Sequence, residues 1–349
     1  MNTNRIACLL TLTIQLVILL AGPTLAATPN AKLENFDSTC PDLHPDWKGS
    51  GDVVVVLSIS GGGKRASAFA YGALSQLQSV QVKVDDNFKT TLLREVDFIS
   101  GVSGGSLPAA FYKINRDAHD PLKGFEKFLN DDTEWDLKLR VAKPWNWSSS
   151  WTTILAEYFK ETLYGKTTFG DLEAWPHLVI NATDLSTGLR FNFTPSQFNC
   201  IGSDLSRFPV AYAVAASAAY PVYFPPLVLE NFNYPPSPGI RPERRKGHYV
   251  QLSDGGLVDN FATRVYLDML LRQFLVGDPD GRFRPLARAL VVIRIDASGN
   301  LGLEYSESPD SPGLRTRLER AFDVSSEQQI RDSQTLLDQQ IVADRKSVV

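Results

Sequence analysis

A serine between glycines is the residue of this chain whose surroundings best suit it to covalent chemistry. Ser103 lies in the sequence Gly-Val-Ser-Gly-Gly at 101–105, after an apolar stretch at 96–99 and before a helix-like run at 106–114. A strand-to-helix turn this tight has room only for glycine at its flanks, and it pushes the serine hydroxyl outward. The pattern therefore predicts a nucleophile elbow and a serine acyl hydrolase.

The base that would activate Ser103 is restricted by the positions of the histidines. A serine hydroxyl is a poor nucleophile until a neighbouring group accepts its proton. An α/β-hydrolase places its triad in the order serine, acid, histidine, but no histidine follows Asp254, the best acid candidate. A histidine triad would therefore need an unusual order or a histidine beyond residue 349. The four histidines are His44, His119, His177 and His248.

Asp254 precedes a glycine pair between two apolar stretches. Asp-Gly is a common turn sequence, so the pattern on its own favours an ordinary turn. The alternative is that Asp254 is the base for Ser103, and a third motif in the chain favours this alternative.

The third motif is a glycine loop, Ser-Gly-Gly-Gly-Lys-Arg at 60–65, which follows an expected buried strand at 53–59 and precedes an expected helix at 66–80. A loop at a helix N-terminus presents backbone N–H groups to a negative charge, either a phosphate or an oxyanion. A Walker loop is excluded, because Ser58 and Arg65 stand where it needs a glycine and a hydroxyl residue.

A dinucleotide site at this loop is disfavoured as well. About twenty residues further on, no acidic residue ends a clear second strand, as that fingerprint requires. An oxyanion hole for the ester attacked by Ser103 fits better, because the charge that develops on the carbonyl oxygen needs preorganised donors.

Together the three motifs resemble the patatin-like phospholipase family, whose Gly-Gly-Gly-x-Arg, Gly-x-Ser-x-Gly and Asp-Gly-Ala/Gly motifs appear here in that order. Two further stretches, 181–188 and 215–226, look like the same family, and the resemblance spans residues 52–297. It implies an α/β fold, a three-layer α/β/α sandwich with a mainly parallel central sheet. Two positions depart from the family pattern, since Ser60 replaces a common aspartate and Ala66 a common glycine.

The resemblance also implies a role for each residue of the motifs. Ser103 is expected to be the nucleophile and Asp254 the base of a dyad without histidine, with no metal and no cofactor. Arg65 is expected to support the glycine loop or to meet an anionic head group. The other expected site residues are Gly61, Gly62, Gly63 and Gly104 in the oxyanion hole, Gly101 and Gly105 in the elbow, and Gly255 and Gly256 beside the base.

Composition agrees with an enzyme of one large domain. The chain has 349 residues, of which 43% are hydrophobic, enough for a substantial core in a catalytic domain at 52–300. A net charge of −4 argues against nucleic acid as a partner. In an insertion at 117–175, four of the six tryptophans fall within seventeen positions: Trp135, Trp145, Trp147 and Trp151. They indicate either a lid that meets a lipid surface or a subdomain packed on the sheet.

The N-terminus is typical of a targeting segment. Residues 1–26 have a polar start, an apolar run and small residues before Ala27, which favours a cleaved signal peptide over a membrane anchor. Cleavage leaves an N-terminal segment at 27–51. It also leaves Cys40 and Cys200, as a disulfide or as two separate thiols. A helical tail at 301–349 stops without capping signals, as a truncated end would.

The sequence therefore predicts an exported lipid acyl hydrolase, periplasmic or secreted, of the phospholipase or lysophospholipase type. It would act through an acyl-enzyme on a lipid or phospholipid, with peripheral membrane contact. One alternative is an acyltransferase that uses the same dyad. The other is a non-catalytic exported lipid-binding protein on the same fold.

Overall fold

The computed structural model describes residues 28–34, 53–83, 89–141, 143, 149–234, 247–264, 289–297 and, with short gaps, 313–335. The expected signal peptide and Cys40 lie outside these ranges. Cys200 is disulfide-bonded, so of the two alternatives for this cysteine the separate thiol is wrong. In the described residues no helix has the length and apolar character needed to cross a membrane.

A seven-stranded sheet forms the centre of the described fold, in the order β7-β8-β5-β4-β1-β9 with β6 also paired to β5. Only β6 and β8 run against the other strands of this sheet. The strands are β1 (Val53–Ile59), β4 (Phe98–Val102), β5 (His177–Asp184), β6 (Leu189–Asn192), β7 (Leu227–Glu230), β8 (Tyr249–Asp254) and β9 (Ala289–Ile295). A separate pair joins β2 (Gln81–Lys83) to β3 (Lys89–Thr91).

The apolar run at the start of the catalytic domain forms β1 because a central parallel strand is buried on both faces. Every residue of β1 after Val53 is buried. Its partner β9 pairs with it over the full length, from Val53 with Ala289 to Ile59 with Ile295. The strand expected at 53–59 is therefore confirmed.

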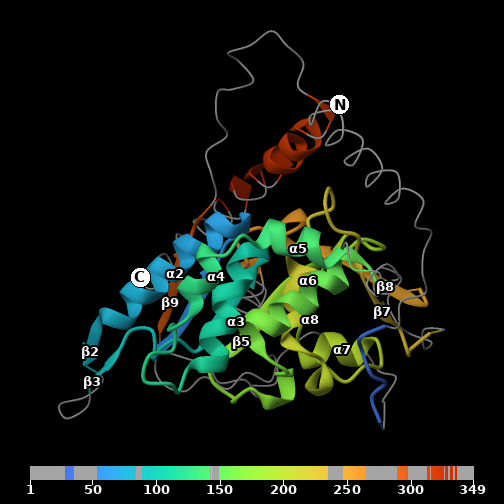
Figure 1. Cartoon of the computed structure of the whole chain (residues 1–349). Helices are drawn as coiled ribbons and strands as arrows, with labels where there is room; N and C mark the ends of the chain where they lie inside the picture. The colour runs from blue at the N-terminus through green and yellow to red at the C-terminus, as the bar shows by residue number, and fades with distance from the viewer. Residues whose placement is uncertain are drawn as a thin grey trace.

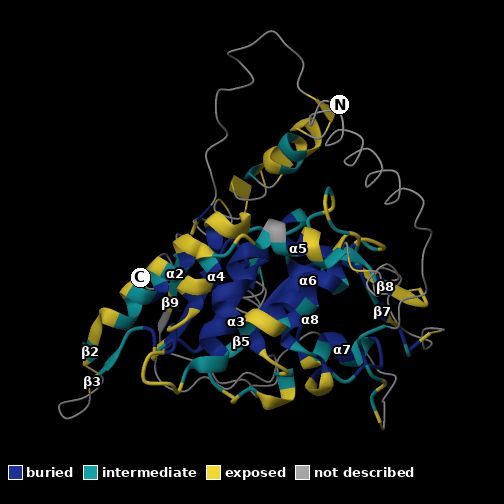
Figure 2. Cartoon of the chain, in the orientation of Figure 1, coloured by how far each residue is buried: buried dark blue, intermediate teal, exposed yellow. Residues whose placement is uncertain are grey.

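Helices flank the sheet, and Figure 1 shows α3, α6 and α8 against the face turned towards the viewer. These three are almost entirely buried in Figure 2, as expected for helices without a polar stripe. The arrangement confirms the expected α/β class and is consistent with three layers. The helices are α2 (Gly63–Ser79), α3 (Ser106–Asn115), α4 (Phe125–Asn130), α5 (Thr133–Val141), α6 (Trp151–Phe159), α7 (Pro195–Cys200) and α8 (Val210–Ser217).

The tryptophan-rich insertion supplies aromatic side chains to the core. Phe125, Phe128 and Phe159 are all buried, and the rings of Phe128 and Phe159 meet edge-on with centroids 6.1 Å apart. The described part of the insertion therefore packs as a subdomain. Trp151, at the start of α6, is partly buried. The side chains of Trp135, Trp145 and Trp147 lie outside the description.

A C-terminal helix, the described residues of 313–335, lies above the first turn of α2 and above α5 (Figure 1). This helix lies within the helical tail that the sequence predicts at 301–349. Most of its surface is exposed in Figure 2.

Candidate active site

Ser103 and Asp254 are in direct contact. The Ser103 hydroxyl donates a hydrogen bond of 2.7 Å to Oδ2 of Asp254, and both side chains are buried. Strand register explains the contact. Val102 pairs with Asn181 on one edge of β5 and Asp254 pairs with Ala182 on the other, so β4 and β8 end at the same level on either side of β5.

The elbow is strained at the nucleophile and closely packed at its flanks. Ser103 has a φ of 50°, in the left-handed region that L-residues other than glycine rarely adopt. A Cβ at Gly101 would lie 2.6 Å from Cα of Ser106, and one at Gly105 would lie 2.4 Å from the carbonyl oxygen of Ser60. Neither flank can carry a side chain, which is the physical reason for the glycines.

Ser217 holds the elbow from the side of α8. Its Oγ accepts a 2.9 Å hydrogen bond from the Ser103 N–H and donates one of 2.6 Å to the carbonyl oxygen of Asn181. The Asn181 amide donates to Ser100 Oγ at 2.7 Å and to the Gly101 carbonyl at 2.9 Å. Ser217 and Asn181 thus fix the strained backbone on both sides of Ser103. Sequence reasoning marked their stretches but missed these contacts.

Asp254 forms a turn and contacts the nucleophile at the same time. Its Oδ1 accepts a 2.8 Å hydrogen bond from the N–H of Gly256, which caps a short 3-10 helix at Gly255–Leu257. Asp254 therefore has both expected roles, since Oδ1 stabilises the turn and Oδ2 contacts Ser103 as a base would. Burial raises the pKa of Asp254 to about 6, while the hydrogen bonds from Gly256 and Ser103 act in the opposite direction.

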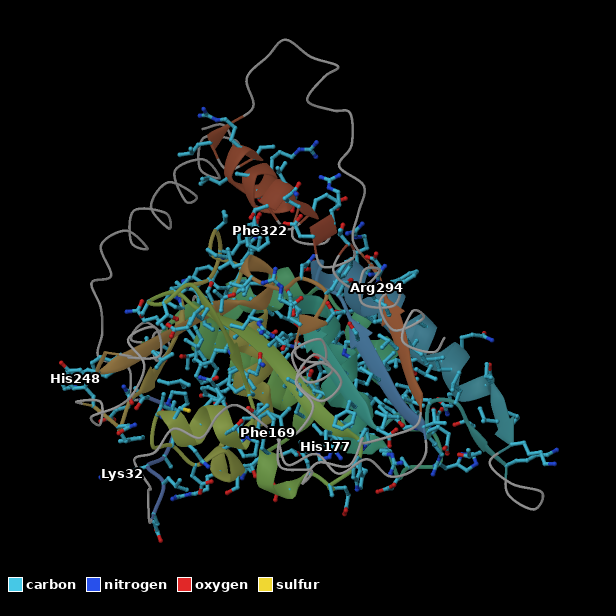
Figure 3. All side chains as sticks on the ribbon, turned by 180° about the vertical axis from the view of Figure 1, so that it is seen from behind. Lys32, Phe169, His177, His248, Arg294 and Phe322 are labelled. Carbon is cyan, nitrogen blue, oxygen red and sulfur yellow. The ribbon has the colours of Figure 1, made fainter. Side chains whose placement is uncertain are left out.

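The described histidines lie far from this pair. His177 begins β5, four residues before Asn181, and is therefore about 13 Å away along the strand. His248 precedes β8 and is about 20 Å from Asp254 on the same estimate. Figure 3 shows His177 at the end of the sheet opposite to the C-terminal helix, on which Phe322 lies. His119 follows the far end of α3, and His44 lies outside the described residues.

The glycine loop contacts the elbow, but one of its expected donors is already bonded. The Gly61 N–H donates to the carbonyl oxygen of Asn260 at 3.0 Å, so the expected oxyanion role of Gly61 does not fit this arrangement. Gly62 and Gly63 have φ values of 134° and 63° and form the cap and first residue of α2. N–H groups at such a position have no acceptor within the helix.

The two departures from the family pattern are accommodated by the surrounding backbone. Ser60 is fully buried, and its Oγ accepts a 2.7 Å hydrogen bond from the N–H of Ala297 beyond β9. Ala66 is fully buried in the first turn of α2. Arg65 is exposed, and its charge acts on Asp323 of the C-terminal helix. Arg65 therefore faces the cavity described next.

A cavity of about 710 Å³ opens over Ser103 and Asp254. One part of its wall is apolar and comes from α3 to α6. Another part is aromatic and charged and comes from the loop after α8 and the C-terminal helix, which sequence reasoning did not connect with the site. The apolar residues are Leu107, Phe128, Leu137, Leu155 and Phe159. The aromatic and charged ones include Tyr220, Tyr223, Glu319, Arg320, Phe322, Asp323 and Glu327.

Comparison with known proteins agrees with the motifs. The family model described as patatin-like phospholipase matches residues 57–267, more than half of the chain. The chain is also 25% identical to "Patatin-like protein 4" of Arabidopsis thaliana over 265 residues, which cover 73% of this chain and 62% of that relative. The elbow, the base motif and most of the cavity wall fall within the family match. The chain belongs to the patatin-like phospholipase family.

Proposed function

We propose that the protein is an exported lipid acyl hydrolase of the phospholipase or lysophospholipase type. The observation that carries the proposal is the 2.7 Å hydrogen bond from Ser103 to Asp254 at the floor of a cavity with an apolar wall. A nucleophile within hydrogen-bond reach of its base is the geometry that covalent acyl transfer requires. Family membership supports a lipid as the substrate.

In the first half of the reaction, Asp254 accepts the hydroxyl proton while Ser103 Oγ attacks the ester carbonyl carbon. The carbonyl oxygen becomes an oxyanion, and the N–H groups of Gly62, Gly63 and Gly104 are the proposed donors to it. When the C–O bond of the ester breaks, Asp254 returns the proton to the leaving alcohol. The acyl chain remains on Ser103.

In the second half, a water molecule takes the place of the alcohol. Asp254 accepts a proton from this water as its oxygen attacks the acyl-enzyme, and then returns a proton to Ser103 Oγ as the fatty acid leaves. A pKa of about 6 suits both directions of transfer. The carboxylate is mostly ionised at neutral pH, yet it is a stronger base than an exposed aspartate.

The apolar wall is the proposed site of the acyl chain. Leu107, Leu155 and Phe159 are buried side chains that border the cavity and offer no polar group to an ester. Covering an acyl chain there removes apolar area from water, which is favourable by roughly 0.8 kcal/mol per buried CH₂ group.

Export and membrane contact are part of the proposal. The targeting pattern at residues 1–26 supports export, and the disulfide at Cys200 agrees with an oxidising compartment. Leu314 and Leu318, four residues apart on the C-terminal helix, are 66% and 50% exposed beside the cavity. Exposed apolar side chains at this place support contact with a lipid surface.

The test of the proposed function is covalent labelling with a fluorophosphonate probe, followed by mapping of the labelled peptide. We expect labelling at Ser103, no labelling of Ser103→Ala, and release of free fatty acid from a phospholipid by the wild type. Fatty acid moved to an added alcohol in preference to water would identify an acyltransferase. No labelling and no release, with the lipid still bound, would overturn the hydrolase proposal and favour the lipid-binding alternative.

A further inference from the structure

The C-terminal helix turns a charged face towards the cavity. Glu319, Asp323 and Glu327 follow one another at intervals of four residues, so they lie on one face, and all three border the cavity. Leu314 and Leu318 of the same helix are exposed. A surface helix normally packs its apolar stripe inward and its charges outward. Of the large apolar side chains in the described part of this helix, Phe322 alone borders the cavity, and it does so among the carboxylates.

Aromatic rings surround these carboxylates. The Phe322 ring meets the Tyr220 ring edge-on, with centroids 4.5 Å apart and an interplanar angle of 65°. The Tyr220 and Tyr223 rings lie 5.7 Å apart. The Tyr223 hydroxyl also donates to a carboxylate oxygen of Glu319. The cluster therefore joins the loop after α8 to the C-terminal helix.

The cluster is adjacent to the reacting groups. Asp254 donates its backbone N–H to the carbonyl of Ala219 at 3.0 Å, and Tyr220 is the next residue. After burial, the carboxylates of Asp323 and Glu319 raise the pKa of Tyr220, so both lie close to its hydroxyl. Lys64, Arg65 and Arg320 border the same cavity, so charges of both signs surround it. A cation at this place would meet ring faces and carboxylates together.

We propose that Tyr220, Tyr223, Phe322, Glu319 and Asp323 bind the ammonium group of a zwitterionic phospholipid such as phosphatidylcholine while its ester lies at Ser103. Aromatic rings attract such cations through the negative potential of their faces, and adjacent carboxylates add charge attraction. The inference rests on the proposed function and names its substrate class. Phe322 and both carboxylates lie beyond residues 57–267, so the family match does not include them.

Positive charge is available for the phosphate of the same head group. Arg65, at the first turn of α2, borders the cavity and acts electrostatically on Asp323 across it. A head group with a phosphate and an ammonium group would place each charge near its opposite. An anionic head group, such as that of phosphatidylglycerol, would bring no cation to the three carboxylates and would be repelled by them.

The first experiment compares kcat/KM for dihexanoyl phosphatidylcholine and dihexanoyl phosphatidylglycerol within each variant. We expect the wild type to prefer the choline lipid. Phe322→Ala and the isosteric Asp323→Asn should lower the choline-to-glycerol ratio about tenfold, the scale of a lost desolvated cation–π or charge contact. Val324→Ala, an exposed residue of the same helix that lies outside the cavity wall, is the matched control and should keep the wild-type ratio.

The second experiment measures binding without turnover. Ser103→Ala is titrated with the same two lipids below their micellar concentrations, with and without Asp323→Asn, and binding is followed by calorimetry. We expect tighter binding of the choline lipid, and we expect Asp323→Asn to remove the difference. Equal binding of both lipids, or a preference that persists in Asp323→Asn, would overturn the ammonium site. Because Ser103→Ala does not need to hydrolyse the lipid, this experiment tests the ammonium site even if the proposed hydrolase function is wrong.

Discussion

A Cβ on Gly104 would lie 1.9 Å from the carbonyl oxygen of Gly63, so the nucleophile elbow and the glycine loop are in backbone contact. Ser67 on α2 joins the same two segments, because its Oγ donates to the Gly104 carbonyl at 2.6 Å. The contact holds the first turn of α2, with its unpaired N–H groups, beside Ser103. An oxyanion hole depends on such a fixed arrangement of donors.

Gly104→Ala is therefore expected to separate the elbow from the glycine loop. A methyl group at 1.9 Å from backbone cannot be accommodated by a side-chain movement. We expect kcat/KM to fall by about 100-fold or more, as for a lost oxyanion donor, together with a lower free energy of unfolding. Ester hydrolysis and urea denaturation measure the two effects.

The matched control is Gly72→Ala in the middle of α2. No atom lies within 4 Å of a Cβ built there, so this change should stabilise the protein by about 0.5–1 kcal/mol through helix propensity. Activity of Gly104→Ala at the level of Gly72→Ala would contradict the close contact between the two motifs.

The activity should have an acid limb set by Asp254. Its pKa is raised to about 6 by burial, and only the ionised carboxylate can accept the proton of Ser103. We expect kcat/KM to fall tenfold per pH unit below about pH 6 and to level off above it. Stopped assays with a short p-nitrophenyl ester give the profile. His119→Gln and His248→Gln change exposed residues, so both variants should show the wild-type pH profile. Loss of the acid limb in either variant would indicate a histidine triad instead of the dyad.

Asp254→Asn should stabilise the fold while it removes activity. A folded-state pKa of about 6 against an ordinary value of 3.8 means that Asp254 contributes stability below pH 3.8 and loses it as pH rises through 6. The ionised carboxylate then costs up to about 3 kcal/mol at pH 8. We expect the variant to unfold at higher urea than the wild type at pH 8 and at nearly equal urea at pH 4. Equal midpoints at pH 8 would contradict the raised pKa.

The elements that position the dyad could be predicted because their patterns are local. The valine run of β1 indicates a strand that is buried on both faces. The glycines around Ser103 indicate positions with no room for a side chain. Both features can be recognised from the sequence alone. The pairing of Ser103 with Asp254 followed from the lack of a suitable histidine and from the family resemblance. The register of β4, β5 and β8 supplies its geometric reason.

The remaining parts of the site depend on long-range packing that no local pattern encodes. Ser217 is one polar residue in an apolar helix, and its partners at 103 and 181 are distant in sequence. Gly61 was expected to donate to an oxyanion, but the carbonyl of Asn260 takes its N–H. Phe322 reaches Tyr220 from a tail with ordinary helical spacing. In each case the partner could be identified only once the chain was folded.

Ser217→Ala tests whether the strained elbow needs its support. The change removes the acceptor of the Ser103 N–H and the donor to the Asn181 carbonyl, and all three groups are buried. Each unsatisfied buried group costs about 1–3 kcal/mol, so we expect a free energy of unfolding lower by at least that amount. We also expect kcat to fall about tenfold with KM little changed, because Ser103 can relax from its φ of 50°.

Ser75→Ala separates this effect from the general loss of a serine. Ser75 Oγ also donates to a backbone carbonyl, that of Tyr71, but within α2 and outside the cavity wall. Its removal should change kcat by less than twofold. A fluorophosphonate labelling rate that falls in Ser217→Ala and stays constant in Ser75→Ala would locate the defect at the nucleophile itself. Equal labelling rates in the two variants would show that the elbow keeps its conformation without the hydrogen bond from Ser103 to Ser217.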